Sequence, residues 1–261
     1  MTRIIAISNQ KGGVGKTTTA INLAAALATA DLSVLVIDLD PQGNASCGLG
    51  IAREGLSCSL YDLLLDRAHP KETILPTQIA NLDVLPSNRD LVGATIELLE
   101  FPGKEGKLRR LMPKIAKNYH YVLIDCPPSL GILTVNALVS ANSLLAPIQC
   151  EYFALEGLSD LFRTVSRIRN KLNPHLEIEG VLLTMYDERL NLSNQIRSDV
   201  SKHLGSELFQ TVIPRNVRLA ECTSFGKPVF LYDARCKGAN SYIALANEII
   251  SRSRQRTKKV S

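Results

Sequence analysis

The stretch Gln10–Thr18, which reads QKGGVGKTT, decides the fold of this 261-residue chain. It follows a β-branched run, Arg3–Ser8, and it leads into Lys16–Thr29, where Ala, Leu and Ile recur at helical spacing. A strand, a glycine-rich loop and a helix in this order predict a phosphate site. Backbone N–H groups of such a loop converge on phosphate oxygens, and the positive end of the helix lies behind them.

Each residue type in the loop suits that chemistry. Lys16 is placed to reach β- and γ-phosphates, and Thr17 can offer its hydroxyl to Mg²⁺. The ordinary pattern G-x-x-x-x-G-K-[ST] requires glycine at position 10, where this chain has Gln10, and the chain adds a second lysine at Lys11. A glycine-rich turn with chance lysines is the alternative, and the flanking strand and helix argue against it.

Further short apolar strands are expected along the chain, and most of the gaps between them are long enough for helices. Their ranges are Ser33–Ile37, Leu82–Leu85, Tyr121–Ile124, Ser143–Ile148, Ile178–Thr184 and Phe209–Ile213. The pattern predicts an α/β fold of P-loop NTPase type, a single domain with a mostly parallel sheet and helices on both faces. Ligands then bind at the carboxyl ends of the strands.

The C-terminal end of the chain differs from the rest in charge. The last helix is expected over Ala239–Ser251, and its apolar stripe stops after Ile250. We therefore assign residues 1–251 to the domain and residues 252–261 to a basic, flexible tail. The net charge of +5 comes from this tail, because the remaining residues carry equal numbers of basic and acidic side chains. Overall charge therefore does not indicate nucleic-acid binding.

Composition sets the remaining bounds. The chain is 45% apolar and 21% charged, as in ordinary globular proteins, and its longest apolar runs are far too short for a membrane span. The N-terminus passes directly into a strand, without a signal-peptide pattern, so we expect a cytoplasmic protein. The six cysteines include no C-x-x-C pair, which favours reduced thiols over disulfides or a zinc site.

Two carboxylate motifs follow predicted strands. The first is Asp38-Leu39-Asp40, and the second begins at Asp125. An aspartate at the end of a hydrophobic strand beside a phosphate loop commonly serves the shell of a bound metal, and Asp125 fits that role. Capping of a turn is the alternative for either motif.

Together with four later segments, the loop KGGVGKTT resembles the ParA/Soj chromosome- and plasmid-partition ATPases, and the resemblance covers essentially the whole chain. The segments are VLVIDLDPQGNAS (Val34–Ser46), YVLIDCPPSLG (Tyr121–Gly131), PIQCEYFALEGL (Pro147–Leu158) and VIPRNVRLAE (Val212–Glu221). This family belongs to the deviant Walker A class, which also contains MinD. The chain resembles its short form, which lacks an N-terminal DNA-binding domain.

The resemblance implies an ATPase that uses ATP and Mg²⁺ and hydrolyses slowly. It implies a nucleotide-sandwich homodimer in which Lys11 crosses to the partner's ATP while Lys16 serves its own. Asp40 then orients the attacking water and reaches the metal through water, as Asp125 does, while Thr17 binds the metal directly. An additional positive charge at the transferring phosphoryl group is what an arginine finger supplies elsewhere.

The nucleotide-binding residues implied by the resemblance lie in the loop and in two later segments. They are Lys11, Gly12, Gly13, Val14, Gly15, Lys16, Thr17 and Thr18 at the phosphates, with Met185, Pro214 and Asn216 at the adenine.

The resemblance also implies that ATP-bound dimers bind DNA without sequence preference, which would associate the protein with the nucleoid. Arg189 and Arg218 match the DNA-binding positions, and Arg215 is a third candidate that could instead anchor its loop. A ParB-type centromere-binding partner is expected to stimulate hydrolysis. Membrane binding is not expected, because large apolar residues are missing after Ile250. A MinD-type positioning ATPase and a metabolic enzyme of dethiobiotin-synthetase type remain the alternatives.

Overall fold

The computed structural model describes residues 2–151 and 154–260, and the described residues form a seven-stranded sheet in the order β3-β4-β2-β5-β1-β6-β7. Its strands are β1 (Arg3–Ile7), β2 (Val34–Asp38), β3 (Leu75–Pro76), β4 (Leu82–Leu85), β5 (Tyr121–Asp125), β6 (Ser143–Gln149) and β7 (Glu177–Thr184). Every neighbouring pair is parallel except β3 and β4. The expected mostly parallel α/β sheet is therefore confirmed.

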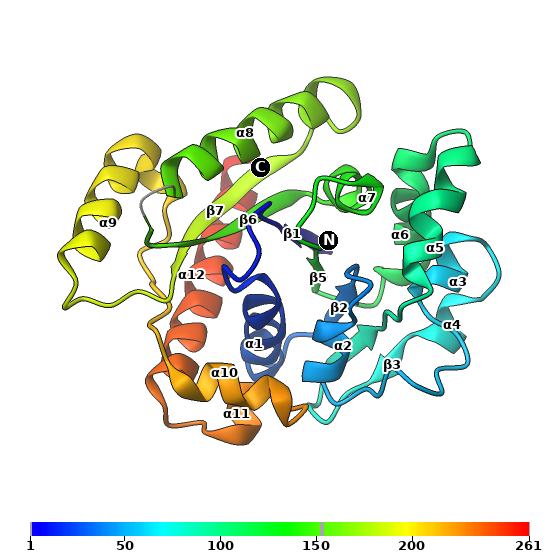
Figure 1. The fold of residues 1–261 in the computed structure, drawn as a ribbon, viewed down its shortest axis with the longest axis horizontal. Coiled ribbons are helices and arrows are strands. Elements are labelled where there is room, and N and C mark those ends of the chain that lie inside the picture. Colours follow the sequence, from blue (N-terminus) through cyan, green and yellow to red (C-terminus); the bar gives the residue numbers. More distant parts are fainter. Residues whose placement is uncertain (1, 152–153, 261) are drawn as a thin grey trace.

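Helices cover both faces of the sheet (Figure 1). They are α1 (Lys16–Thr29), α2 (Asn44–Gly48), α3 (Leu60–Leu64), α4 (Pro70–Thr73), α5 (Leu91–Glu97), α6 (Lys107–Ile115), α7 (Ile132–Ser140), α8 (Ala154–Lys171), α9 (Asn191–Leu204), α10 (Val217–Ser224), α11 (Val229–Tyr232) and α12 (Lys237–Val260). Because successive strand side chains point to opposite faces, Ile5 and Ile7 pack with α1 and α12, whereas Ala6 packs on the side of α7 and α8. Two buried apolar clusters thus sandwich the sheet.

The predicted strand Phe209–Ile213 is wrong. This segment runs beside β7 and makes single backbone hydrogen bonds, from Phe209 N to Val181 O and from Ile213 N to Leu183 O, both at 2.9 Å. The Phe209 ring lies against Gly180, where an added Cβ would be 2.6 Å from Cε2. The segment therefore covers the edge of β7 through these two separate backbone hydrogen bonds and the Phe209 ring, without forming a continuous strand.

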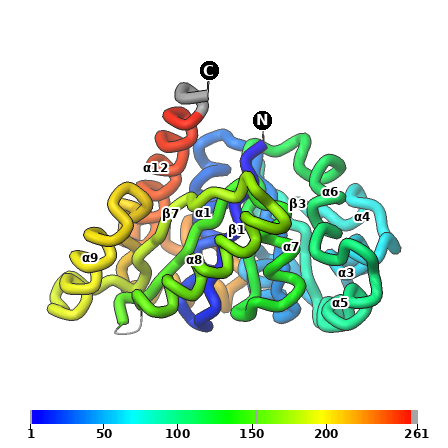
Figure 2. The backbone as a smooth tube through the Cα atoms, turned by 90° about the horizontal axis from the view of Figure 1, so that it is seen from above, coloured from blue at the N-terminus to red at the C-terminus, as the bar shows by residue number. Residues whose placement is uncertain are grey.

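The last helix does not end at Ser251 as predicted, because α12 continues to Val260. Polar anchors take over where the apolar stripe stops. Arg252 donates to Leu208 O at 3.0 Å and pairs with Glu248 at 2.7 Å, and Arg256 pairs with Glu177 at 3.0 Å. Figure 2 shows the red part of α12 on the same side of the molecule as the start of β1. Part of the basic segment is thus bound to the domain, which the sequence pattern did not indicate.

This fold brings the predicted phosphate loop and both carboxylate motifs to one edge of the sheet. The loop follows β1, and the aspartates end β2 and β5, which flank each other with β1 beside β5. Among the described residues, no helix is both long enough and apolar enough to cross a membrane. All six cysteines are free thiols.

Candidate functional site

The glycine-rich loop folds tightly between β1 and α1. Gly13 and Gly15 have φ values of +74° and +88°, which side chains other than glycine rarely adopt. The helix begins at Lys16, with Gly15 as its N-cap. The hydroxyl of Thr184, at the end of β7, donates to Val14 O at 2.8 Å and ties the loop to the sheet. The loop is thus held in one conformation in front of a helix N-terminus.

Lys16 lies inside this loop and is only 7% exposed. Its Nζ donates to the carbonyl oxygen of Lys11 at 2.8 Å. Burial lowers the pKa of Lys16, although the negative charges of Asp125 and Asp40 oppose that shift. A buried ammonium with one carbonyl acceptor retains N–H donors for an anion.

The carboxylates of Asp38 and Asp125 are completely buried at the ends of neighbouring strands, where the two residues are direct partners in the β2–β5 register. Burial and the negative charge of Asp38 raise the pKa of Asp125, which outweighs the hydrogen bond from the Thr17 hydroxyl to Oδ2 at 2.8 Å. Asp125 Oδ1 has no hydrogen-bond partner among the described residues. Such an orphaned oxygen marks a place for a ligand.

These residues fit a hard cation. Asp38, Asp40 and Asp125 are at most 8% exposed, and the buried Lys16 is the cation beside them. Oxygen ligands are what Mg²⁺ prefers, and it usually retains waters and takes phosphate oxygens as well. Within residues 2–151 and 154–260, no three His, Cys, Asp or Glu side chains gather closely enough to hold a metal. A cation at Thr17 and Asp125 would therefore need oxygens from water or from a nucleotide.

Asp38 organises the loops around this edge, a role that sequence reasoning did not assign. It accepts hydrogen bonds from Ser46 N and Ser46 Oγ, both at 2.7 Å, and from Asp40 N at 3.2 Å. Ser46 Oγ in turn accepts one from Ser87 N, after β4, at 3.1 Å. Asp40 itself accepts from Gln42 N at 2.9 Å. The sequence signal that could have pointed to this role of Asp38 is the pair of aspartates two residues apart, Asp38 and Asp40.

Lys11 and Gly12 lie on the outside of the loop. Lys11 forms an ion pair with Glu151 of the same chain, and its side chain is 52% exposed. At Gly12 an added Cβ would meet only Pro128 Cβ, at 4.0 Å, which is an ordinary contact. Nothing within the described chain therefore requires glycine at position 12.

A pocket of about 340 Å³ adjoins the loop, and the three predicted adenine residues line it. Met185 has a φ of +49°, in the left-handed region, at the turn that ends β7. Asn216 caps α10 by accepting a hydrogen bond from Arg218 N at 2.8 Å, with Pro214 before it. Val217 and Tyr242, which the sequence did not single out, also line the pocket. The fold thus brings segments from β7, α10 and α12 to the phosphate loop.

The two arginines that match DNA-binding positions lie on the surface, each beside carboxylates. Arg189 donates two hydrogen bonds to Asp187, at 2.9 and 2.6 Å, and these bonds lower the pKa of Asp187 to about 2. Arg218 contacts Glu221 at 3.0 Å and Asp233 at 3.4 Å. Their positive charges are therefore compensated locally.

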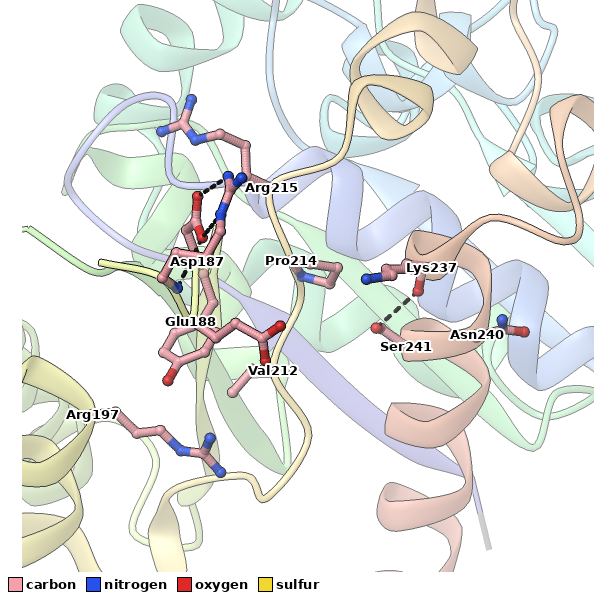
Figure 3. A pocket seen from close by; sticks show the side chains of 11 residues that line it. Asp187, Glu188, Arg197, Val212, Pro214, Arg215, Lys237, Asn240 and Ser241 are labelled. Atoms are coloured by element: carbon pink, nitrogen blue, oxygen red, sulfur yellow. Dashed lines mark hydrogen bonds and ion pairs between the residues drawn. The ribbon is translucent and has the colours of Figure 1, made fainter. Parts of the chain in front are cut away.

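A surface cavity of about 670 Å³ lies beside Arg189, and Arg197, Arg215 and Lys237 line it (Figure 3). Arg197 and Lys237 lie on opposite sides of Pro214 in that view. None of the ion pairs among the described residues involves Arg197, Arg215 or Lys237. These three cations were not recognised as a group from the sequence, because they come from α9, the segment before α10, and α12.

The parallel sheet, the glycine loop after β1 and the carboxylates at the ends of β2 and β5 define a protein of the P-loop NTPase class. A family model described as an AAA domain matches residues 2–178. The chain is 53% identical to the chromosome partitioning protein ParA of Caulobacter vibrioides, covering 99% of this chain and 98% of the relative. It is 51% identical to the sporulation initiation inhibitor protein Soj of Bacillus subtilis, covering 95% and 98%. The chain belongs to the ParA/Soj family of partition ATPases.

Solved structures agree with this assignment. The chain is 36% identical to a structure titled cobyrinic acid a,c-diamide synthase from Mycobacterium smegmatis with bound ADP and magnesium, with a TM-score of 0.83, covering 95% of this chain and 93% of the other. The cell division ATPase MinD of Pyrococcus furiosus is 28% identical, with a TM-score of 0.80 and coverage of 96% and 99%. The P-loop NTPase fold and the relation to partition and positioning ATPases are therefore established.

Proposed function

We propose that this chain is an ATP-dependent dimerisation switch that segregates DNA. The observation that carries the proposal is the division of labour between the two loop lysines. Lys16 is buried in the loop, whereas Lys11 is exposed and is held only by the surface carboxylate of Glu151. The burial of Lys16 supports a role at the chain's own nucleotide, and the exposure of Lys11 supports a role at the nucleotide of a second chain.

ATP would bind with its phosphates against the backbone N–H groups of the loop and the ammonium of Lys16. Its adenine would enter the pocket at Met185, Pro214 and Asn216. The ADP and magnesium bound in the Mycobacterium smegmatis structure support binding of a nucleotide and Mg²⁺ by similarity. Mg²⁺, when bound, would neutralise phosphate charge, with Thr17 as a direct ligand and with Asp40 and Asp125 reached through water.

Hydrolysis would depend on Asp40. Its carboxylate lies at the same edge as Lys16 and is nearly buried, so it can accept a hydrogen bond from a water beside the terminal phosphate. The network through Asp38 and Ser46 fixes the backbone on which Asp40 sits. One chain lacks a second cation at the transferring group, and Lys11 of a second copy would supply it. Turnover is therefore slow until two copies meet.

Dimerisation would bring two loops face to face. Lys11 would exchange Glu151 for the partner's phosphates, which is favoured because a phosphate carries more charge than a surface carboxylate. The open space at Gly12 agrees with a constraint that comes from outside the chain. If a second copy approaches closely at this position, a side chain at position 12 would block it, which would explain why the chain has glycine there.

DNA binding would follow from dimerisation. Each copy contributes Arg189 and Arg218 together with the cavity cations Arg197, Arg215 and Lys237. Weak phosphate contacts on one copy become useful when two copies present them together, because each neutralised phosphate adds to the affinity. A ParB-type partner bound to a centromere would then stimulate hydrolysis and release the dimer from DNA.

The test is DNA binding measured without nucleotide, with ADP and with ATP, using the wild type and the Lys11→Ala variant. Tight binding only for the wild type with ATP is expected, and equal binding in all three states would contradict the proposal. Two readouts address the alternatives. Co-sedimentation with anionic liposomes in ATP would favour a MinD-type role, and a requirement for an added metabolite before phosphate is released would favour a metabolic enzyme.

A further inference from the structure

A groove of about 600 Å³ lies between the start of α4 and the end of α6. Figure 1 shows these two helices on the side of the molecule away from α9 and α10. We call it the basic groove and define it by three lysines, Lys71, Lys114 and Lys117, and by its apolar residues Ile74 and Ile115. It takes no part in the function proposed above.

The three lysines of the basic groove have no acidic partner. All three are exposed, and no ion pair among the described residues includes them. No aspartate or glutamate lines the groove. Of the carboxylates nearby, Glu72 accepts from the backbone N–H of His69 at 3.3 Å, and Asp83 accepts from the Tyr119 hydroxyl at 2.7 Å. The positive charge therefore faces solvent uncompensated.

The charge extends along α6. Residues 104–117 contain six basic side chains and one acidic one, a stronger bias than around α10. Lys107 is buried and paired with Asp66, whereas Arg109 and Arg110 donate to backbone carbonyls. Lysines near the C-terminal end of a helix complement its dipole, which accounts for Lys114 and Lys117. It does not account for Lys71, which the fold places across the groove on α4.

The apolar residues that line the basic groove indicate whether a nucleic acid or a peptide fits it better. Ile115 and Pro70 are buried, Ile74 is half-buried and Pro113 is exposed, so hydrocarbon surface lies between the lysines. A nucleic-acid backbone would pair with the lysines but would leave this surface without an apolar partner. A peptide with both carboxylates and apolar side chains satisfies both features. We propose that the basic groove binds an acidic segment of a protein partner that also carries apolar side chains.

The position of the groove makes this binding independent of nucleotide. Lys117 and Tyr119 precede β5, at the amino edge of the sheet, whereas Asp125 ends β5 at the edge where the phosphate loop lies. The partner would therefore stay bound in every nucleotide state.

Fluorescence anisotropy with a short labelled peptide of alternating glutamate and leucine tests the proposal on the full chain. The peptide should bind equally without nucleotide, with ATP, and to Lys16→Ala, so failure of the proposed switch would not affect the result. Charge reversal at Lys71, Lys114 and Lys117 together should weaken binding about tenfold or more. The same reversal at three exposed cations elsewhere that also have no ion pair among the described residues, Arg167, Lys171 and Lys227, is the matched control and should change little.

A separate variant tests whether the apolar residues of the basic groove contribute to peptide binding. Ile74→Ala should lower the affinity for the glutamate–leucine peptide a few-fold and leave the weaker affinity for poly-glutamate unchanged. Thermal unfolding checks that each variant is folded. The proposal is overturned if the wild type binds a glutamine-for-glutamate peptide equally well, or if the triple reversal leaves peptide binding intact. Loss of duplex DNA binding in the triple variant, with peptide binding unchanged, would assign the groove to DNA instead.

Discussion

The pKa values of Asp38 and Asp125, at the nucleotide edge, and of Asp187, at the surface before α9, are shifted in opposite directions. Burial raises the pKa of Asp38 to about 6 and also raises that of Asp125, whereas hydrogen bonds from Arg189 lower the pKa of Asp187 to about 2. The first group is buried with too little positive charge around it, and the second is already paired at the surface. A ligand therefore completes the nucleotide edge but must compete with existing partners at the surface. Substitutions should have large effects in the first region and small ones in the second.

The largest effect is expected for Lys16→Ala. Loss of the buried ammonium removes a charge-assisted contact to the phosphates, so ATP affinity should fall about a hundredfold or more. Calorimetric titration measures it. Lys11→Ala should retain ATP binding and lose the ATP-dependent dimer in light scattering. If the Lys11 variant dimerises normally, the division of labour between the two lysines is refuted.

The second-largest effect is expected for Asp40→Ala. The variant should bind ATP and dimerise, because Asp40 orients water and does not hold nucleotide, but phosphate release should fall about a hundredfold. The same preparation should accumulate on DNA as a dimer. Gly12→Val is the companion variant, and it should fold and bind ATP but remain monomeric, since within the chain an added Cβ would meet nothing closer than Pro128 Cβ at 4.0 Å. Normal turnover by Asp40→Ala would remove that residue from the mechanism.

Asp125→Asn should stabilise the nucleotide-free protein. A carboxyl whose pKa is raised on folding from 3.8 binds its proton more tightly in the native state, so wild-type stability falls as pH rises above about 4. The amide is neutral throughout, so the variant should gain about 1 kcal/mol or more at pH 7 and nothing at pH 3. Urea unfolding at both pH values measures this difference. A gain that is independent of pH would point to packing instead of charge.

The effects on DNA should be smaller. Arg189→Glu or Arg218→Glu should flatten the slope of log K against log salt by ~2 in a symmetric dimer, with nucleotide binding unchanged. Arg215→Glu, which breaks no ion pair, should do the same. Arg254→Glu, an exposed change on α12, is the matched control. If only Arg254→Glu loses affinity for DNA, the end of α12 is the DNA-binding element.

The smallest effect is expected for Asp187→Asn. Freeing Arg189 from its carboxylate should raise DNA affinity about twofold, because exposed ion pairs are weak. Stability that Asp187 contributes is present above its unfolded pKa of 3.8 and is lost as pH falls through about 2, so the variant should lack that acid-dependent loss. Unchanged DNA affinity would mean that Asp187 does not compete with phosphates.

Six of the seven strands, the phosphate loop and the strand-end aspartates could be predicted from the sequence, whereas β3 was missed. Glycine spacing and short apolar runs act locally, so Gly13, Gly15 and Asp125 could be placed without knowing what packs around them. The resemblance to the ParA/Soj family, carried by those same segments, was confirmed by the relatives.

Features that join segments far apart in the chain could not be predicted from the sequence and were visible only in the folded structure. It joined Asp38 to Ser46 and Ser87, and it brought Lys71 opposite Lys114. In the folded structure, residues 209–213 lie along the edge of β7 and do not form the predicted strand. Arg252, beyond the end of the apolar stripe, donates a hydrogen bond to Leu208 O. Periodicity reports burial along one element, whereas these contacts depend on which elements become neighbours, and long-range packing alone sets that.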